Sequence, residues 1–299
     1  MSAQRIRVVM CGVQARRRSG LRDDGFGDRR GVGATNVWIQ IQLSRGCAVS
    51  VSVSFLGHAT AMLDVTGVRV LTDPVLRTRL MFLRRVVPPV PAATYDGVDV
   101  VAISHLHHDH CDVPSLAMLD RDVAIIVPDG GEEFVRGNGF RNVVPLRPGQ
   151  SHRVGPVTLT ATPAVHDGTR KPFGPSAAAV GYLITSADSR IYFAGDTDLF
   201  PAMRDLSPDL DLALLPVWGW GPSLGPGHLD PVRAATAVEL LRPRHAVPIH
   251  WGTLFPYGLK AFYPDRLRVP PRAFARAVAD RGGTEVLVLD PSGEQVRLP

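Results

Sequence analysis

The sequence predicts an α/β protein in which strands outnumber helices, as in a sandwich of sheets rather than a doubly wound sheet. Hydrophobic residues make up 45% of the 299-residue chain, which is enough for a substantial core. Short apolar runs of strand length recur from Val51 onward, separated by turns that use many of the 29 glycines and 26 prolines. The spacing is compatible with two halves, each built from a sheet and helices.

Strands are expected wherever a short apolar or alternating run is bounded by turn residues. The first run alternates polar and apolar residues, as a half-buried strand does, and a Thr-Gly turn joins the next two. The expected strands are 51–55, 61–65, 68–71, 98–103, 123–127, 157–162, 179–185, 190–194, 211–215, 245–249 and 285–289.

Helices are expected where capping residues flank a longer run. Asp230 is a good N-cap and Pro231 suits the first helical position, which predicts a helix through Leu241. A second helix is expected over 271–281, closed by two glycines. Shorter helices are expected at 115–119 and 132–136.

The first 48 residues differ from the rest in charge and in pattern. They hold nine arginines and three aspartates, a net charge of +6; of the chain's 33 basic and 28 acidic residues, 24 and 25 remain, a net charge of −1. They also lack apolar periodicity, so we expect a basic, disordered extension over 1–48 and one globular domain over 49–299. Two alternatives are a functional basic tail and a natural start near Val49 or Val51.

Composition narrows the class of protein. No apolar run approaches the ~20 residues of a membrane span, and the apolar stretch after Arg7 is too short for a signal peptide. The three cysteines have neither zinc-pair nor disulfide-framework spacing, which favours a reducing, cytoplasmic location. The charge of the body argues against a nucleic-acid partner. Transient membrane contact and a homo-oligomer stay open.

The most informative stretch is 104–110, in which four histidines and one aspartate follow the apolar run 98–103. Packing explains such density poorly, because each buried ring nitrogen needs a partner. Imidazole and carboxylate are instead the nitrogen and oxygen ligands that zinc-like ions take. The sequence therefore predicts metal ligands at the end of a buried strand; the alternative is a solvated histidine loop.

The order of residues within this stretch indicates which side chains face the ion. His105 and His107 are two positions apart, so in an extended segment they face the same way. Asp109 and His110 follow where the chain is expected to turn. His108 alternates to the other side, and we do not expect it to bind the ion.

One loop cannot complete a metal site, so further ligands are expected at other strand ends. His166 follows the run 160–165, Asp196 follows 191–195, and His250 follows 245–249. Any one of these alone is an ordinary turn residue. Three at equivalent places, together with the histidine cluster, predict a metal centre.

Together these residues resemble the signature of the metallo-β-lactamase fold superfamily. The motif H-x-H-x-D-H stands at His105–His110, followed by His166, by the Gly-Asp-Thr around Asp196, and by His250. The likeness runs from about Phe55 to the C-terminus. It most resembles the branch containing N-acylphosphatidylethanolamine-hydrolysing phospholipase D and the ascorbate-6-phosphate lactonase-like proteins. The segments that resemble this branch are FLGHAT (55–60), LTDPV (71–75), GHLDP (227–231) and PIHWGT (248–253).

This resemblance implies a four-layer αββα sandwich with the site at one edge, between two sheets. It also implies two divalent ions, zinc first, with manganese or iron as alternatives for an all-His/Asp ligand set. A hydroxide bridging the two ions would be the nucleophile, and Asp109 would hold its proton. Implied ligands of one ion are His105, His107 and His166, those of the other are Asp109, His110 and His250, and Asp196 would bridge both.

Several other residues are candidates for contact with the substrate. His228 precedes a helix and could donate a proton, or else orient neighbouring groups. The segment 80–89 could shelter an apolar group while an arginine meets a phosphate, or could simply cover the core. Asp73 is expected as a turn residue or a carboxylate that supports a ligand. The substrate-contact candidates are His58, Arg84, Arg85, Trp218 and Trp220.

The sequence therefore predicts a dinuclear metal-dependent hydrolase that acts on a phosphodiester, with a small-molecule or lipid-like substrate. The first alternative is a lactonase or other carboxylic ester hydrolase with the same fold. A nuclease of this superfamily is a weaker alternative, because the body of the chain is not basic. A non-catalytic metal or ligand sensor is the weakest, because all seven expected ligand positions are filled.

Overall fold

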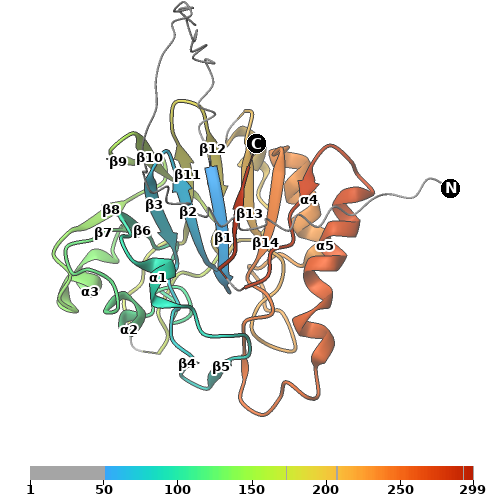
Figure 1. The fold of residues 1–299 in the computed structure, drawn as a ribbon, viewed down its shortest axis with the longest axis horizontal. Helices are drawn as coiled ribbons and strands as arrows, with labels where there is room; N and C mark the ends of the chain where they lie inside the picture. The colour runs from blue at the N-terminus through green and yellow to red at the C-terminus, as the bar shows by residue number, and fades with distance from the viewer. Residues whose placement is uncertain (1–50, 173, 207, 292, 299) are drawn as a thin grey trace, which may run out of the picture. The chain divides into compact units, whose positions relative to one another are not determined.

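The computed structural model describes residues 51–172, 174–206, 208–291 and 293–298. Its strands form two seven-stranded sheets and one small three-stranded sheet (Figure 1). The extension expected over 1–48 lies outside the described residues and stays a prediction. Among the described residues, the helices are all too short or too polar to cross a bilayer.

The first sheet combines the strands of the N-terminal half with one from the end of the chain, in the order β17-β1-β2-β3-β6-β7-β8. Neighbours from β17 to β3 are antiparallel, and neighbours from β3 to β8 are parallel. The strands are β1 (Val51–Gly57), β2 (Thr60–Val65), β3 (Val68–Thr72), β6 (Val100–Ala102), β7 (Ala124–Pro128), β8 (Val143–Leu146) and β17 (Gln295–Arg297).

The second sheet has the order β16-β14-β13-β12-β11-β10-β9 and the same division into antiparallel and parallel parts. Neighbours from β9 to β12 are antiparallel, and neighbours from β12 to β16 are parallel. The strands are β9 (Ser151–Val154), β10 (Val157–Pro163), β11 (Val180–Thr185), β12 (Arg190–Phe193), β13 (Leu212–Pro216), β14 (His245–Ile249) and β16 (Glu285–Val286).

The small sheet pairs a hairpin with a strand from much later in the chain. The hairpin consists of β4 (Arg79–Leu80) and β5 (Leu83–Arg85), and β5 also pairs with β15 (Leu254–Pro256). A small core of its own, which includes Leu80, Leu83 and Leu254, supports this sheet.

Two of the described helices, α2 and α4, begin at a side-chain cap, and the cap of α4 is the one that the sequence indicates. The side chain of Asp230 accepts hydrogen bonds from two backbone N–H groups of α4, and Asp112 caps α2 in the same manner. The helix α5 begins before the expected Pro271, because prolines are tolerated in a first turn. The helices are α1 (Ala92–Tyr95), α2 (Val113–Leu116), α3 (Glu132–Gly137), α4 (Pro231–Leu241) and α5 (Val269–Ala279), with 3₁₀ turns at Pro201–Asp205 and Pro264–Leu267.

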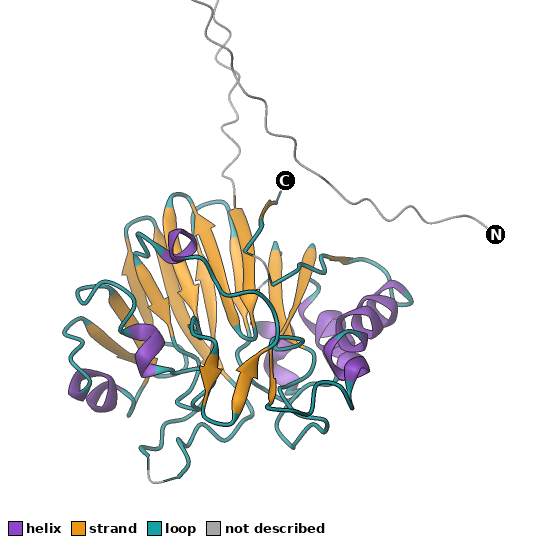
Figure 2. Cartoon of the chain, turned by 60° about the horizontal axis from the view of Figure 1, so that its bottom comes forward, coloured by secondary structure: helices purple, strands orange, loops and turns teal. Residues whose placement is uncertain are grey.

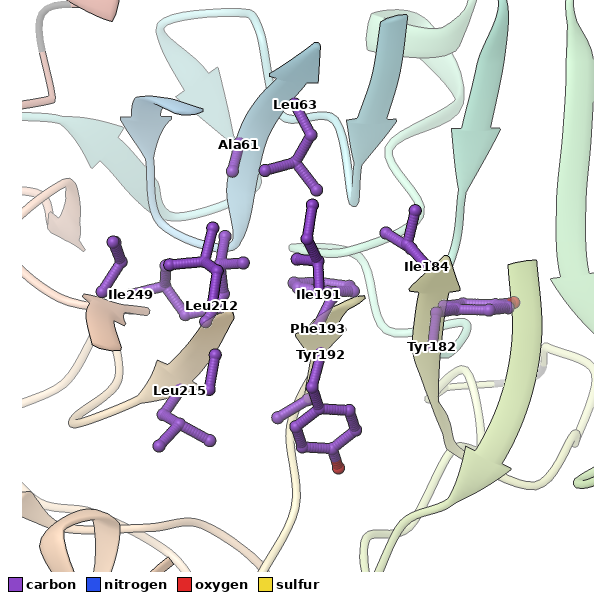
Figure 3. Close-up of a cluster of buried hydrophobic side chains, with 14 of the residues drawn as sticks. Ala61, Leu63, Tyr182, Ile184, Ile191, Tyr192, Phe193, Leu212, Leu215 and Ile249 are labelled. Carbon is purple, nitrogen blue, oxygen red and sulfur yellow. The ribbon is translucent and has the colours of Figure 1, made fainter. Parts of the chain in front are cut away.

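The two large sheets pack face to face with helices on their outer faces. Between them, Ala61 and Leu63 of the first sheet face Ile184, Ile191 and other apolar side chains of the second (Figure 3). A second cluster joins α1, α2 and α3 to the outer face of the first sheet. The helices α4 and α5, at the right of Figures 1 and 2, pack against β13 and β14. This is the predicted αββα order.

Every expected strand is present, although the last is reduced to two residues and six others were not foreseen. One unforeseen strand, β8, is an apolar run interrupted by Pro145. The other five are short or polar: β9 is partly exposed along its length, and β4, β5, β15 and β17 have two or three residues each. Such strands lack the apolar run on which a sequence pattern depends. They are held by tertiary pairing instead.

Candidate metal centre

The expected metal ligands lie in four loops that follow β6, β10, β12 and β14. Because β12, β13 and β14 are parallel, their carboxyl ends meet at one edge of the second sheet. The loop after β6 comes from the first sheet, and its end turns tightly, since the N–H groups of His110 and Cys111 both donate to the carbonyl of His107. The ligand loops of both sheets therefore converge.

The first group of side chains comprises His105, His107 and His166, which offer nitrogen atoms within 4.8 Å of one another. His107 Nδ1 lies 3.3 Å from His166 Nε2. His105 is fully buried, whereas the other two are half-buried at the edge of the site. These are the three side chains that the resemblance assigns to one ion.

The second group comprises His58, Asp109, His110 and His250, again with ligand atoms within 4.8 Å of one another. His110 Nε2 lies 3.1 Å from His250 Nε2, and each of these nitrogens lies 3.8 Å from Asp109 Oδ2. Three of these side chains are those assigned to the other ion. His58 is an addition to that set.

Asp196 lies where the two groups adjoin. Its Oδ2 is 3.2 Å from His110 Nε2 and 3.3 Å from His250 Nε2, and it also groups with His166 and His228. Its Oδ1 is buried and has no hydrogen-bond partner among the described residues. The carboxylate is therefore placed to face both groups.

Hydrogen bonds on the outer side of the rings fix which nitrogen faces the centre. The Nδ1–H of His110 donates to Asp73 Oδ2 at 2.7 Å, that of His250 donates to the carbonyl of Trp218 at 2.8 Å, and that of His166 donates to the carbonyl of Gly227 at 2.9 Å. In a neutral ring the other nitrogen then carries a lone pair. Each Nε2 lone pair is directed inward, which is the arrangement that outer partners impose on metal-binding histidines.

Ser104 extends the same pattern to His105. The Ser104 hydroxyl donates to Asp73 Oδ2 at 2.6 Å, so it accepts from the Nδ1–H of His105 at 2.9 Å. His105 Nε2 is then left buried without a partner. Asp73 thus supports two histidines from behind, as expected for a carboxylate that is not itself a ligand.

These residues fit a divalent metal. If both rings were neutral, the Nε2 lone pairs of His110 and His250 would face each other at 3.1 Å with no proton between them, and His105 Nε2 and Asp196 Oδ1 are buried and unpaired. A buried cation would give all of these atoms a partner. Without one, burying them in the protein interior would cost free energy, because their polar atoms would stay unpaired. The donor set contains only imidazole and carboxylate, which suits zinc, manganese or iron.

Charge interactions within the centre set the protonation states. Burial lowers the pKa of His105 well below its usual value. Burial would raise the pKa of Asp196, but the charge of His250 and His110 holds it well below the usual range. Burial would likewise lower the pKa of His110, yet the carboxylates of Asp196, Asp109 and Asp73 raise it well above its usual value. A proton on His110 therefore stands where a metal cation would bind.

A cavity of about 430 Å³ lies beside the centre. His228 lines it, and the Nε2 of His228 lies 3.4 Å from Asp196 Oδ2 while its Nδ1–H faces the carbonyl of Pro226 at 3.0 Å. Trp218 and Arg233 also line this cavity, and Arg233 pairs with Asp198. The structure thus brings two of the expected substrate contacts to one opening.

Other expected substrate contacts lie elsewhere. The ring of His58 is buried and directed at Asp109, so it supports the centre instead of lining the cavity. Arg85 is also buried and donates to the carbonyls of Leu56 and Pro88, so the expectation that it meets a phosphate is wrong. Burial lowers its pKa to about 10.

Arg84 and Trp220 belong to the small sheet and its surroundings. The Arg84 guanidinium is exposed and lies 5.8 Å from the ring centroid of Tyr257. The Trp220 ring packs edge-on against Phe82 with centroids 5.3 Å apart. Neither residue lines the cavity beside His228, so the sequence grouped residues that the structure separates.

Sequence reasoning missed two residues that hold the centre. Arg170 is buried and donates from Nη1 to the carbonyls of Leu106 at 2.8 Å and Cys111 at 2.9 Å, at both ends of the ligand run. Gly195 has φ of +60°, and a Cβ there would lie 2.4 Å from the Cβ of Ser104. No sequence pattern marks Arg170, which is a single arginine in a loop. Gly195 does carry a signal, because a glycine directly before an expected ligand indicates a tight turn or a close approach of the backbone.

The chain is similar to a known family and to several known proteins. Residues 68–251 match the family model of the beta-lactamase superfamily domain. A UPF0173 metal-dependent hydrolase of Deinococcus radiodurans is 33% identical over 248 residues, which cover 81% of this chain and 97% of that relative. An uncharacterized protein of Mycobacterium tuberculosis is 33% identical over 225 residues, which cover 70% of this chain. The chain spans only 60% of the length of that mycobacterial relative.

A relative named for an activity and a solved structure extend the comparison. N-acyl-phosphatidylethanolamine-hydrolyzing phospholipase D 1 of Caenorhabditis elegans is 28% identical over 235 residues, 70% of this chain and 66% of the relative. The solved structure of Igni18, a metallo hydrolase from Ignicoccus hospitalis, shares the fold with a TM-score of 0.65 and 24% identity over 84% of this chain and 99% of that one. The chain therefore belongs to the metallo-β-lactamase superfamily, as its ligand motifs predict.

Proposed function

We propose that this chain is a metal-dependent hydrolase that binds two divalent ions and cleaves a phosphodiester, with a lipid-like substrate as the leading class. One observation carries the proposal. Seven side chains from four loops direct nitrogen and oxygen atoms into two adjoining groups, while hydrogen bonds engage the outer nitrogens of four rings. Such outer support is typical of metal ligands.

Each ion has its own set of protein ligands in this proposal, and zinc is the leading metal. When bound, the two ions supply Lewis acidity, which lowers the pKa of a water and stabilises negative charge on substrate oxygens. Asp196, facing both groups, joins them. The proposed ligands are His105, His107 and His166 for one ion and Asp109, His110 and His250 for the other.

Asp109 and His228 are the proposed proton-handling groups. Asp109 keeps one carboxylate oxygen against His58 at 2.9 Å, so its orientation is fixed and it can hold the proton of the attacking water. The side chain of His228 is 21% exposed and lines the cavity, so a substrate oxygen can reach it. His228 then donates a proton to the leaving oxygen.

The choice of a phosphodiester rests on the cavity and on the relatives. The opening beside His228 offers the apolar ring of Trp218 to an apolar part of the substrate. Its guanidinium, Arg233, is paired with Asp198, so the two ions rather than this arginine would meet an anionic part. The C. elegans relative is named for hydrolysis of a phospholipid diester. A lactone or carboxylic ester is the competing substrate class.

The first experiment measures hydrolysis of bis(p-nitrophenyl) phosphate by metal-depleted protein reloaded with Zn²⁺ or Mn²⁺, beside a panel of lactones. We expect turnover of the diester that needs metal and is lost in Asp196→Ala. Asp188→Ala, an exposed carboxylate in the turn between β11 and β12, is the matched control and keeps full turnover. Turnover of lactones alone would overturn the diester assignment, and no turnover with either metal would overturn hydrolysis.

A further inference from the structure

Four large apolar side chains on the turns around the small sheet are more than half exposed. Met81 is 62% exposed, Phe82 55%, Tyr257 75% and Phe262 75%. The backbone N–H of Tyr257 donates to the carbonyl of Phe82 at 3.1 Å, so the two turns that carry them adjoin. In Figure 1 the hairpin and the orange segment after β15 lie at the same end of the domain. We call Met81, Phe82, Tyr257 and Phe262 the aromatic patch.

The hairpin turn itself is unusual. Leu80 pairs with Leu83, so Met81 and Phe82 form a two-residue loop, and Met81 has φ of +50°. Such loops favour Asn-Gly and similar pairs, because a positive φ strains a residue with a large side chain. Here the chain keeps two large apolar residues at an exposed tip that polar residues would form at less cost. The stability of the folded domain in water does not explain why Met81 and Phe82 occupy this tip.

The exposed charges beside the hairpin tip are almost all positive. Arg79 and Arg84 are directly opposite each other in the hairpin, both exposed, and no carboxylate of the described residues pairs with either. Like charges at opposite positions of a strand pair are destabilising. The exposed charged residues of 77–90 and 256–269 are the cations Arg79, Arg84, Lys260, Arg266 and Arg268 and one carboxylate, Asp265. An anionic surface would relieve this repulsion.

We propose that the aromatic patch docks on the surface of an anionic lipid bilayer. Aromatic and aliphatic tips enter the interfacial region of a bilayer, while arginine and lysine reach the headgroup phosphates beside them. A negatively charged leaflet attracts such a cluster of cations. A protein partner fits less well, because the centre of a protein interface is depleted of charge and needs a shape-matched face, whereas these tips lie on two turns interleaved with cations.

A short stretch of chain links this surface to the metal centre. Phe82 packs on Trp220, and two residues earlier the carbonyl of Trp218 accepts the Nδ1–H of His250. Docking through the hairpin would therefore bring the cavity beside Trp218 close to the lipid headgroups. The binding itself does not depend on the proposed reaction, so vesicle binding can be measured without turnover.

The test uses the full chain with vesicles of phosphatidylcholine alone or with one quarter phosphatidylglycerol, scored by co-sedimentation. Brominated acyl chains quench tryptophan only on insertion, and Trp220 lies against the patch. The double variant Met81→Asn/Phe82→Gly has a favoured hairpin turn, so it should fold at least as well. Tyr257→Ser/Phe262→Ser leaves the Trp220 contact intact, and Met118→Ser, which alters an exposed methionine after α2, is the matched control.

We expect the unaltered chain and the Met118 control to bind the anionic vesicles and to be quenched. Both patch variants should bind about tenfold or more weakly and lose quenching. The basic segment 1–48 is present in every sample, so a difference between variants reports the patch alone. Equal binding of patch variants and control, or no binding of the unaltered chain, would overturn the proposal. A dimer that the patch variants convert to monomer would instead assign the patch to a second copy.

Discussion

The ring of His58 and the carboxylate of Asp109 are in direct contact, with His58 Nε2 2.9 Å from Asp109 Oδ2. His58 also holds a second expected ligand, His250. The backbone carbonyl of His58 accepts the N–H of His250 at 2.6 Å, and the two rings pack with centroids 4.0 Å apart. His58 and His250 both have a positive φ, of 58° and 62°. A residue outside the expected ligand set thus positions two members of it.

His58→Ala should weaken metal binding without removing a proposed ligand. The variant loses the N–H that orients Asp109, and loss of such a support typically costs about 10–100-fold in metal affinity. His58→Gln, whose amide can still donate, should recover part of the loss. Competition against a chromophoric chelator measures the affinity, and His152→Ala on the edge strand β9 is the control. An affinity in His58→Ala equal to that of the control would show that the contact is dispensable.

Gly195→Ala should destabilise the fold and disturb the centre. The added methyl would lie 2.4 Å from the Cβ of Ser104 at a φ of +60°, so both crowding and backbone strain act. We expect a loss of more than about 2 kcal/mol in the free energy of unfolding. Chemical denaturation of the metal-free variants measures it.

The matched control for Gly195 is Gly137→Ala at the end of α3. A Cβ at Gly137 has open space around it, and the residue is helical. Alanine should therefore leave stability unchanged or raise it by roughly 0.5–1 kcal/mol. Similar losses at both glycines would contradict the close approach at Ser104.

The sequence predicted the strand ends that carry the proposed ligands better than it predicted the supports behind them. His166, Asp196 and His250 each follow an apolar run of strand length bounded by turn residues, and a short window of sequence contains that whole pattern. The spacing of His105 and His107 likewise needs only local geometry. These are properties of short segments, which is why periodicity and motif were sufficient.

The supports depend on contacts between distant segments, which no local pattern contains. Arg85 resembled a phosphate-binding residue in the sequence, yet its guanidinium is buried against the carbonyl of Leu56. Nothing in the sequence around Arg170 indicates that it donates to two carbonyls of the ligand loop more than fifty residues earlier. Such roles follow from the packing of the two sheets.

Metal affinity should fall as the pH is lowered. Burial alone would lower the pKa of His110, but three carboxylates raise it well above its usual value, so in the metal-free protein a proton occupies the site of the cation. Metal binding must displace that proton. The apparent affinity should rise by about tenfold per pH unit for each proton released. Chelator competition from about pH 6 to about pH 8 measures this dependence, and an affinity independent of pH would contradict it.

The stability of the metal-free protein should have a maximum near the ordinary pKa of histidine, about 6.5. Burial lowers the pKa of His58 to about 3 and that of His107 to about 4, so these rings are neutral when folded and stability rises with pH up to about 6.5. The raised pKa of His110 acts in the opposite sense. The protonated His110 ring contributes fully to the free energy of unfolding below about pH 6.5, and this contribution is lost as the pH rises toward the pKa of His110 in the folded protein. Denaturation at a series of pH values tests this, and a steady rise through neutrality would contradict the state assigned to His110.

Arg170→Leu should loosen the ligand loop from behind. Arg170 is 9% exposed, and its Nη1 donates to the carbonyls of Leu106 and Cys111, which flank the ligands from His107 to His110. Its guanidinium also stacks on Phe134, 4.7 Å from the ring centroid. Leucine can keep the packing but leaves both buried carbonyls without this donor, at a cost of about 1–3 kcal/mol for each. We expect a lower free energy of unfolding and weaker metal binding together, measured by denaturation and by chelator competition.

Arg153→Leu, at an exposed position on β9, is the control and should change neither quantity. A loss of stability with unchanged metal affinity would mean that Arg170 supports the fold without positioning the ligands.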